Sequence, residues 1–232
     1  MTAPPRIGQV RAVLTGAAHP YTRPGSRSAI AKAVRDRPVA AGALGLAGDE
    51  QGDLRVHGGP DKAVHCYAWA HYAHWRTVLP GAAAPLLAQP GAFGENLSLD
   101  LLDEHGACIG DRWQIGSALL ELSQGRQPCW KLNDRFQVPD MARRVQDSSR
   151  AGWYLRVLQP GQLQAGDAVL LRARPHPDWS VARLLQLIAE RSCDPALLDQ
   201  VLALPLPPSW QRLFARRRAQ GQAEDWAARL QG

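Results

Sequence analysis

Residues 111–125 read DRWQIGSALLELSQG, and this stretch decides the fold class. Apolar runs lie on both sides of the Gly116-Ser117 pair, so the pattern predicts two strands joined by a tight turn. Further short strands are expected at 7–14, 152–158 and 168–173, with glycine turns recurring between them. Many short strands with regular glycine turns indicate a mainly β fold, either a mixed β-barrel or a closed sandwich.

Two helices are expected inside this β region. Residues 68–79 carry Trp69, Tyr72, Trp75 and Leu79 at helical spacing. Residues 138–149 predict a second, shorter helix, because Pro139 stands near its start. The segment 28–41 is compatible with one or two strands or with a short helix.

The composition shifts at RPHPDW, residues 174–179, which is rich in proline. Beyond it, Ser180 and Asp194 are suited to cap helices at 180–191 and 194–204, and a third helical segment or a broken pair follows. The sequence therefore predicts two domains, a β domain over 1–175 and a small three-helix domain over 176–232. So small a helical domain is expected to need contacts with the β domain or with a partner in order to be stable.

Bulk composition limits the class of protein. The 232 residues are 45% hydrophobic, which is enough for a folded core. No apolar run approaches the roughly 18 residues that a membrane span needs, and the first residues lack the apolar core of a signal peptide. A cytoplasmic protein that does not bind membranes is the resulting expectation.

The formal net charge is +6, and arginine supplies all the cations except Lys32, Lys62 and Lys131. The first 175 residues hold 20 cations and 15 acids, so the excess lies in the β domain and suits an anionic ligand. Nucleic acid is not an expected partner, because no aromatic platform is evident and acids follow the C-terminal arginines directly.

The strand that ends at Leu122 leads into QGRQPCWK, residues 124–131. The chain has four cysteines and no CxxC pair, so each must be judged alone. Cys129 lies between Arg126 and Lys131, whose charges favour a thiolate, the form that ligates metals or attacks substrates. Pro128 fixes the backbone before it. These neighbours leave the choice between a packing role and a chemical role open.

Two other glycine-rich segments have polar side chains. In HGGPDK, residues 57–62, Gly58 and Gly59 would let the backbone approach an anion, and His57, Asp61 and Lys62 stand beside them. In GAFGENL, residues 91–97, Glu95 and Asn96 would bind a substrate amine or relay a proton. A plain turn remains the alternative for both segments.

Six segments, in order, resemble the MOSC domain (molybdenum cofactor sulfurase C-terminal domain), in its YiiM-like bacterial branch. They are GLAGDEQGD (45–53), VHGGPDKAVHCY (56–67), HYAHW (71–75), PGAFGENLS (90–98), IGDRWQIGSALLELSQGRQPCWKLNDRF (109–136) and GWYLRVLQPGQLQAGD (152–167). The C-terminal helices resemble the three-helix domain of the same branch. The resemblance spans nearly the whole chain.

The resemblance implies a mixed β-barrel that binds molybdenum cofactor, with Cys129 as the protein ligand to the metal. It also implies reduction of N-hydroxylated compounds, such as 6-N-hydroxylaminopurine, to amines. Glu95 or His57 would then deliver a proton beside Cys129. The candidate cofactor-binding residues are Arg27, Arg55, His57, Gly58, Gly59, Asp61, Lys62, Asn96, Arg126 and Lys131.

The same resemblance leaves two alternatives, a sulfur carrier with a persulfide on Cys129 and a non-enzymatic module that binds the cofactor. The C-terminal region has only Cys193, so no intrinsic iron–sulfur cluster is expected. Electrons would come from a separate flavoprotein or ferredoxin-type partner. A homodimer is also compatible with the sequence.

Overall fold

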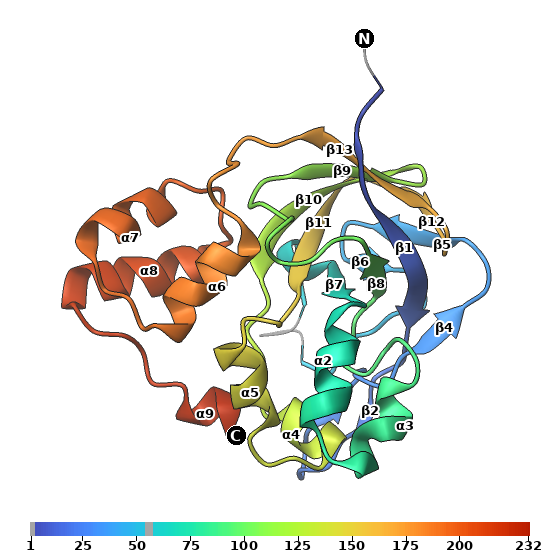
Figure 1. Ribbon diagram of the computed structural model, residues 1–232, viewed down its shortest axis with the longest axis horizontal. Coiled ribbons are helices and arrows are strands. Elements are labelled where there is room, and N and C mark those ends of the chain that lie inside the picture. Colours follow the sequence, from blue (N-terminus) through green and yellow to red (C-terminus); the bar gives the residue numbers. More distant parts are fainter. Residues whose placement is uncertain (1–2, 54–57) are drawn as a thin grey trace.

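The computed structural model describes residues 3–53 and 58–232. In this part of the chain seven strands close into a barrel in the order β13-β9-β10-β11-β7-β8-β1, with β1 pairing back onto β13 (Figure 1). Every neighbouring pair is antiparallel except β7 and β8, which are parallel. The predicted mixed β-barrel is therefore confirmed. The strands are β1 (Arg6–Thr15), β7 (Val64–Ala68), β8 (Leu97–Asp100), β9 (Arg112–Ile115), β10 (Ala118–Gly125), β11 (Trp153–Gln159) and β13 (Ala168–Ala173).

The β9–β10 hairpin forms as its sequence predicts. Ile115 pairs with Ala118, which leaves Gly116 and Ser117 as a two-residue turn. Gly116 has a φ of +55°, and a Cβ there would lie 2.2 Å from the carbonyl oxygen of Gln162. Glycine is therefore required at this turn by both the backbone conformation and the close neighbouring strand.

Short strands extend the barrel on one side. The strand β4 (Ala33–Arg35) pairs with β1. A three-stranded sheet has the order β12 (Gly161–Leu163), β5 (Val39–Gly42) and β6 (Gly45–Leu46), and β2 (His19–Pro20) pairs with β3 (Arg27–Ser28). The ambiguous segment 28–41 is thus extended and contains no helix.

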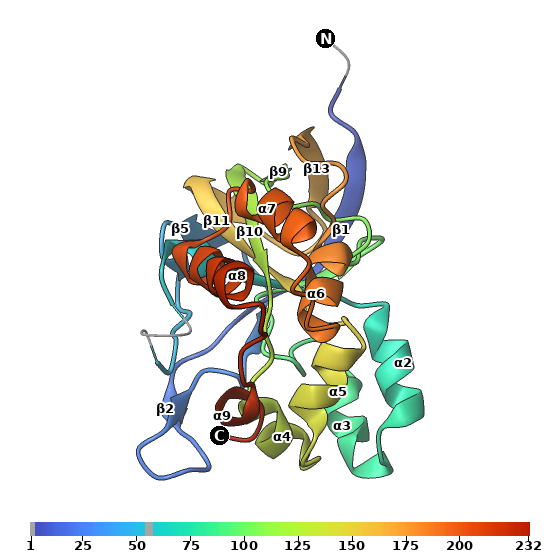
Figure 2. The same cartoon turned by 90° about the vertical axis from the view of Figure 1, so that its left-hand side faces the viewer.

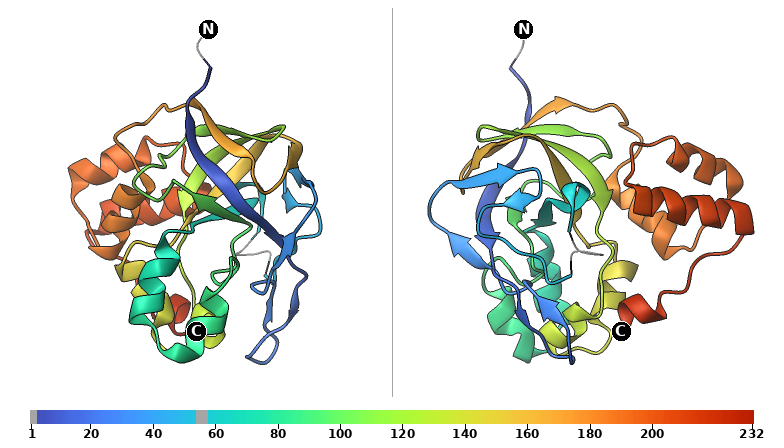
Figure 3. Two further views of the ribbon diagram at one scale, coloured as in Figure 1. Left: turned by 45° about the vertical axis from the view of Figure 1, so that its right-hand side comes forward. Right: turned by 180° about the vertical axis from the view of Figure 1, so that it is seen from behind.

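Helices close one end of the barrel, at the bottom of Figure 1 and of the left view in Figure 3. The predicted helices near 68–79 and 138–149 are confirmed as α2 (His71–Val78) and α5 (Met141–Asp147), whereas α3 (Ala84–Leu87) and α4 (Lys131–Phe136) were not predicted. Single 3-10 turns occur at η1 (Pro60–Lys62) and η2 (Gly81–Ala83). Tyr67, Tyr72, Trp75 and Phe93 join this end to the barrel core, and the Tyr67 and Phe93 rings stack at 4.2 Å.

The remaining helices lie beside the barrel (Figures 1 and 2). They are α6 (Val181–Ala189), α7 (Pro195–Leu202), α8 (Pro208–Gln220) and the short α9 (Ala227–Leu230). Ser180 and Asp194 accept hydrogen bonds from the first turns of α6 and α7, as expected of N-caps. Helix α6 packs closely on β10, since a Cβ at Gly125 would lie 2.8 Å from Leu185. The small helical region is confirmed, and its exact boundary at residue 175 stays a prediction.

Among the described residues, no helix combines the length and the apolar character that a membrane crossing requires.

Candidate functional site

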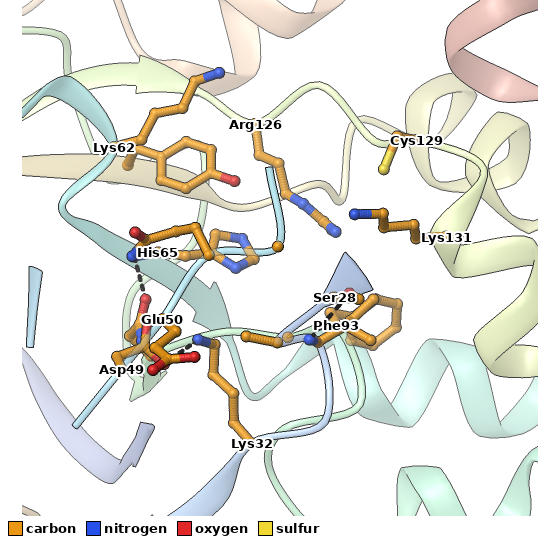
Figure 4. Close-up of a pocket in the computed structure, with 17 residues that line it drawn as sticks. Ser28, Lys32, Asp49, Glu50, Lys62, His65, Phe93, Arg126, Cys129 and Lys131 are labelled. Carbon is orange, nitrogen blue, oxygen red and sulfur yellow. Dashed lines mark hydrogen bonds and ion pairs between the residues drawn. The ribbon is translucent and has the colours of Figure 1, made fainter. Parts of the chain in front are cut away.

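A pocket opens where the end of β10 meets the loops that follow β3 and β6 (Figure 4). Its lining comes from segments far apart in the sequence that the barrel brings together. The described residues that line it are Ser28, Ala29, Ile30, Lys32, Asp49, Glu50, Gln51, Gly52, Lys62, His65, Phe93, Gly94, Asn96, Arg126, Cys129, Lys131 and Tyr154.

The cysteine loop, residues 126–130, carries the thiol of Cys129 to this pocket. It begins where β10 ends, and the Arg126 backbone N–H donates to the carbonyl of Gly152 over 2.9 Å. The Cys129 carbonyl accepts from the N–H of Leu132, so the loop passes directly into α4. Cys129 is half-buried. All four cysteines lie in the described part of the chain, and none of them forms a disulfide.

All three lysines of the chain line this one pocket, although the chain holds 27 lysine and arginine residues in all. With Arg126 they face only two described carboxylates, those of Asp49 and Glu50, which leaves an excess of two positive charges before the thiol is counted. The ends of Arg126 and Lys131 and the sulfur of Cys129 lie on the same side of the pocket (Figure 4). The pocket is therefore suited to an anionic ligand.

Arg126 has unused hydrogen-bonding capacity. Its side chain is buried, and its Nη1 atom has no hydrogen-bond partner among the described residues. A buried guanidinium nitrogen without an acceptor is costly, by about 1–3 kcal/mol or more. An acceptor oxygen of a bound ligand would remove this cost.

The opposite side of the pocket is a closed network of ionic and hydrogen-bonded groups. The Lys32 ammonium forms a buried ion pair with Asp49, whose other carboxylate oxygen accepts from the Asn96 amide over 2.9 Å. Asn96 also donates to the Leu14 carbonyl and accepts from the His65 N–H over 3.0 Å. Asn96 therefore fixes strand β1 and strand β7 at the pocket rather than presenting free polar atoms to a ligand.

Burial controls the titration of the basic groups here. It lowers the pKa of His65 well below its usual value, and the neighbouring Arg126 charge lowers that pKa further. His65 is consequently a neutral imidazole at neutral pH, packed 5.0 Å from the Tyr154 ring. Burial also lowers the pKa of Lys62, although the nearby Cys129 and Asp61 oppose the shift.

Five of the predicted site residues come together in this pocket: Lys62, Asn96, Arg126, Cys129 and Lys131. The Lys131 ammonium donates to the Arg27 carbonyl over 2.6 Å, which ties the cysteine side of the pocket to β3. Arg27 thus contributes its backbone, while its exposed guanidinium donates to the Ala18 carbonyl.

The other described candidates lie outside the pocket lining. Glu95 is fully buried, and its carboxylate accepts from Tyr72, Gly91 and Phe93, an arrangement that holds the 91–95 loop. Asp61 forms an ion pair with Arg156 at 2.9 Å. Gly58 and Gly59 precede the turn η1 and do not line the pocket. The roles predicted for these residues stay predictions, as do those of Arg55 and His57, which lie outside the described residues.

Four residues that help to form the pocket were not among the predicted site residues: Lys32, Asp49, His65 and Tyr154. One signal pointed to Lys32. Lysine is so scarce in this arginine-rich chain that the three lysines were already marked as unusual. His65 stands in the glycine-rich segment 56–67, but Asp49 and Tyr154 had no comparable signal, because only the closed barrel brings them to the pocket.

Comparison with known proteins agrees with the fold. The family model described as "MOSC domain" matches residues 53–170, and the model described as "YiiM-like, 3-alpha helix domain" matches residues 179–221. The chain is 38% identical to Protein YiiM of Escherichia coli (strain K12), covering 95% of this chain and 97% of that protein. The crystal structure of YiiM from Escherichia coli aligns with a TM-score of 0.80 at 31% identity, over 97% of this chain and 99% of that one.

A fungal relative is longer. The chain is 41% identical over 77% of its length to a protein of Gibberella moniliformis (strain M3125 / FGSC 7600) named "Reductase". It spans only 32% of that protein.

Proposed function

Because this chain belongs to the MOSC domain family, in its YiiM-like form, we propose that it is a molybdenum-cofactor-dependent reductase of N-hydroxylated compounds. The observation that carries the proposal is the half-buried Cys129 at the mouth of a pocket that also holds Lys62, Arg126 and Lys131. The name of the fungal relative, a reductase, supports the reaction class.

The residues present suit the cofactor. A thiolate is a soft ligand of the kind that suits a metal already held by dithiolene sulfurs, and Cys129 provides one. The phosphate of the pterin needs cationic and N–H donors. Lys131 supplies one, and Arg126, whose Nη1 has no partner within residues 3–53 and 58–232, supplies another. The enclosed volume is about 90 Å³, so a cofactor-sized ligand would extend from the pocket toward solvent.

The reaction needs protons as well as electrons. Reduction of an N–OH group to an amine takes up two electrons and two protons and releases water; the bound cofactor supplies the electrons. Within the chain, Arg126 and Lys131 would orient the anionic ligand, and Cys129 would hold the metal. We assign Lys62 as a further candidate proton donor, because it lines the same pocket as Cys129 and burial lowers the pKa of its ammonium group. Glu95 and His57 remain the donors predicted from the sequence.

We propose that the electrons reach the site from a separate flavoprotein or ferredoxin-type protein in the cytoplasm. The basic excess of the first 175 residues would favour docking of an acidic donor. Electron transfer by such a route would weaken as the ionic strength rises. A homodimer stays a prediction.

The decisive experiment compares wild type with Cys129→Ala and with Cys193→Ala, a matched cysteine in the helical region. Each is produced in a host that makes molybdenum cofactor, and two quantities are measured. These are the molybdenum content and the rate of 6-N-hydroxylaminopurine reduction with a chemical electron donor. We expect Cys129→Ala to lose at least about 100-fold in rate and most of its metal, and Cys193→Ala to match wild type.

Wild-type protein without molybdenum, together with unchanged activity in Cys129→Ala, would contradict the proposal. Two other outcomes identify the alternatives. A stable mass gain of one sulfur at Cys129 after incubation with a cysteine desulfurase indicates a sulfur carrier. Cofactor binding without any turnover indicates a binding module.

A further inference from the structure

The end of the chain returns from the helical region to the site. After α8, residues 222–232 cross to the closed end of the barrel, where α9 lies beside α4 and α5 (Figures 1 and 2). We refer to residues 222–232 as the C-terminal strap. It lies beyond residues 179–221, which the helical family model matches.

One residue of the strap holds both peptide groups that flank Cys129. The Arg229 carbonyl accepts from the Trp130 N–H over 2.8 Å, and the Arg229 guanidinium donates to the Pro128 carbonyl over 2.6 Å. The other arm of the same guanidinium donates to the Gln146 side chain on α5. Arg229 is half-buried and lies within electrostatic reach of Cys129.

The strap is itself anchored at both ends. Glu224 accepts two hydrogen bonds of 2.8 Å from Arg217, a buried arginine of α8, and a third from the Trp226 indole. Beyond Arg229, the buried Leu230 presents its carbonyl to the Asn133 amide of α4 over 2.8 Å. These contacts keep Arg229 in place relative to the helical region and to α4.

We propose that Arg229 is a positioning residue for Cys129. A short loop outside regular structure opens readily unless its few backbone groups are held, because ordering each residue costs conformational entropy. By holding the peptides on both sides of Cys129, Arg229 keeps the thiol directed into the pocket. The value of this positioning for metal binding rests on the proposed function, but the positioning itself does not.

The test measures how accessible Cys129 is in the full chain without added metal or cofactor. Alkylation by iodoacetamide is followed at each cysteine by mass spectrometry, at a pH at which thiols are ionised, so that the rate reports access. In Arg229→Ala, two hydrogen bonds to the charged guanidinium are lost, and the rate at Cys129 should rise roughly tenfold or more. Cys66 and Cys108, which are buried in the core, should stay as slow as in wild type.

Two further variants complete the comparison. Arg218→Ala removes an arginine of α8 that pairs with Asp199 on α7, away from the cysteine loop, and should leave all four rates unchanged. Arg229→Lys keeps the charge but lacks the planar fork that reaches Pro128 and Gln146 together, so its rate should lie between wild type and Arg229→Ala.

An unchanged rate at Cys129 in Arg229→Ala overturns the proposal, and so does a parallel rise at Cys66 and Cys108, which would mean general loosening. If the alanine variant does not fold, an unchanged rate in Arg229→Lys overturns it. Because no cofactor takes part in alkylation, failure of the proposed reductase activity would be seen separately, in the Cys129→Ala experiment.

Discussion

Glu95 lies between Gly94 and Asn96, which both line the pocket, yet its own carboxylate is fully buried. It accepts from the Tyr72 hydroxyl over 2.5 Å and from the backbone N–H groups of Gly91 and Phe93 over 2.7 and 3.1 Å. These bonds use acceptor positions on both oxygens and fix the loop that places Phe93 against the pocket. At the scale of single residues, the Glu95 carboxylate thus holds the loop that lines the pocket, while its own oxygens do not line the pocket.

Glu95→Gln tests this supporting role. The amide nitrogen cannot accept, so a buried donor of Tyr72, Gly91 or Phe93 loses its partner, and the free energy of unfolding should fall by about 1–3 kcal/mol. Urea unfolding followed by tryptophan fluorescence measures the change. The control is Glu190→Gln at an exposed position, where we expect a change within about 0.5 kcal/mol. A proton donor would behave differently: Glu95→Gln would keep its stability and lose turnover.

Local sequence was enough to identify one side of the pocket and not the other. Arg126, Cys129 and Lys131 lie within six residues, so their charges and the thiol could be related before the fold was known. Asp49 and Asn96 are 47 residues apart, and only the closed barrel brings them into contact. For Glu95 the sequence indicated suitable chemistry for a proton donor, which stays a prediction, whereas the hydrogen bonds that hold its carboxylate are evident only from the structure.

At the scale of elements, the β7–β11 pair determines where the cysteine loop begins. Trp153 of β11 pairs with Cys66 of β7, and Gly152 directly before it accepts from the Arg126 N–H. Gly152 has a φ of +80°, and a Cβ there would lie 2.3 Å from the Cys66 carbonyl oxygen. No side chain fits at that distance, so Gly152 permits the close approach of β7 that brings His65 beside the loop.

Gly152→Ala should therefore cost more than an ordinary glycine replacement. Gly166 is the matched control, because its φ is +92° but a Cβ added there would have no atom within 4 Å. Gly166→Ala should lower the free energy of unfolding by about 1 kcal/mol, the cost of a positive φ for alanine. Gly152→Ala should lower the free energy of unfolding by roughly 3 kcal/mol or more, because strand β7 must also move to make room for the Cβ. Thermal unfolding of both variants measures the difference, and equal losses would show that the Cys66 contact is unimportant.

Helix α4 shows why one element beside the site could not be predicted. It has six residues and no side-chain cap at its start, so its sequence gives little helix signal. Its stability comes from distant contacts: Asn133 accepts from the Ala142 N–H and donates to the Leu230 carbonyl. The nine-residue apolar helix α6, with its serine cap, was by contrast predicted from the sequence.

At the scale of the whole molecule, two of the connections between the helical region and the barrel lead to the cysteine loop. Helix α6 packs on β10, the strand that leads into the cysteine loop, and the C-terminal strap reaches the same loop from the other side. The buried Arg217–Glu224 pair is central to the second connection. The small helical region thus packs against the barrel, as predicted, and two of its contacts lie at the cysteine loop around Cys129.

This connection should depend on pH. Although burial opposes it, hydrogen bonds from Arg217 and Trp226 lower the pKa of Glu224 from its ordinary 4.5 to about 2. A carboxylate with a lowered pKa stabilises the fold fully above pH 4.5 and loses that contribution as the pH falls toward 2. The stability gap between wild type and Glu224→Gln in urea should therefore narrow on acidification from about pH 6 to about pH 3.

The comparison for this prediction is Asp199→Asn, which breaks an exposed pair between Asp199 of α7 and Arg218, the neighbour of Arg217 on α8. Both side chains of this pair are exposed and solvent screens their attraction, so this variant should be close to wild type near neutral pH. A difference in unfolding free energy between wild type and Glu224→Gln that stays constant with pH would show that the Glu224 carboxylate is not bound by Arg217 and Trp226 as the structure indicates.

The placement of the three lysines has a practical consequence for spectroscopy. Every side-chain amine in the chain lines one pocket, so reductive methylation with isotope-labelled formaldehyde would install its side-chain NMR probes only there. The methyl resonances of Lys32, Lys62 and Lys131 would report a bound ligand from three sides without any mutation. Most proteins carry lysines over their whole surface, and this arginine-rich chain offers instead a naturally site-selective label.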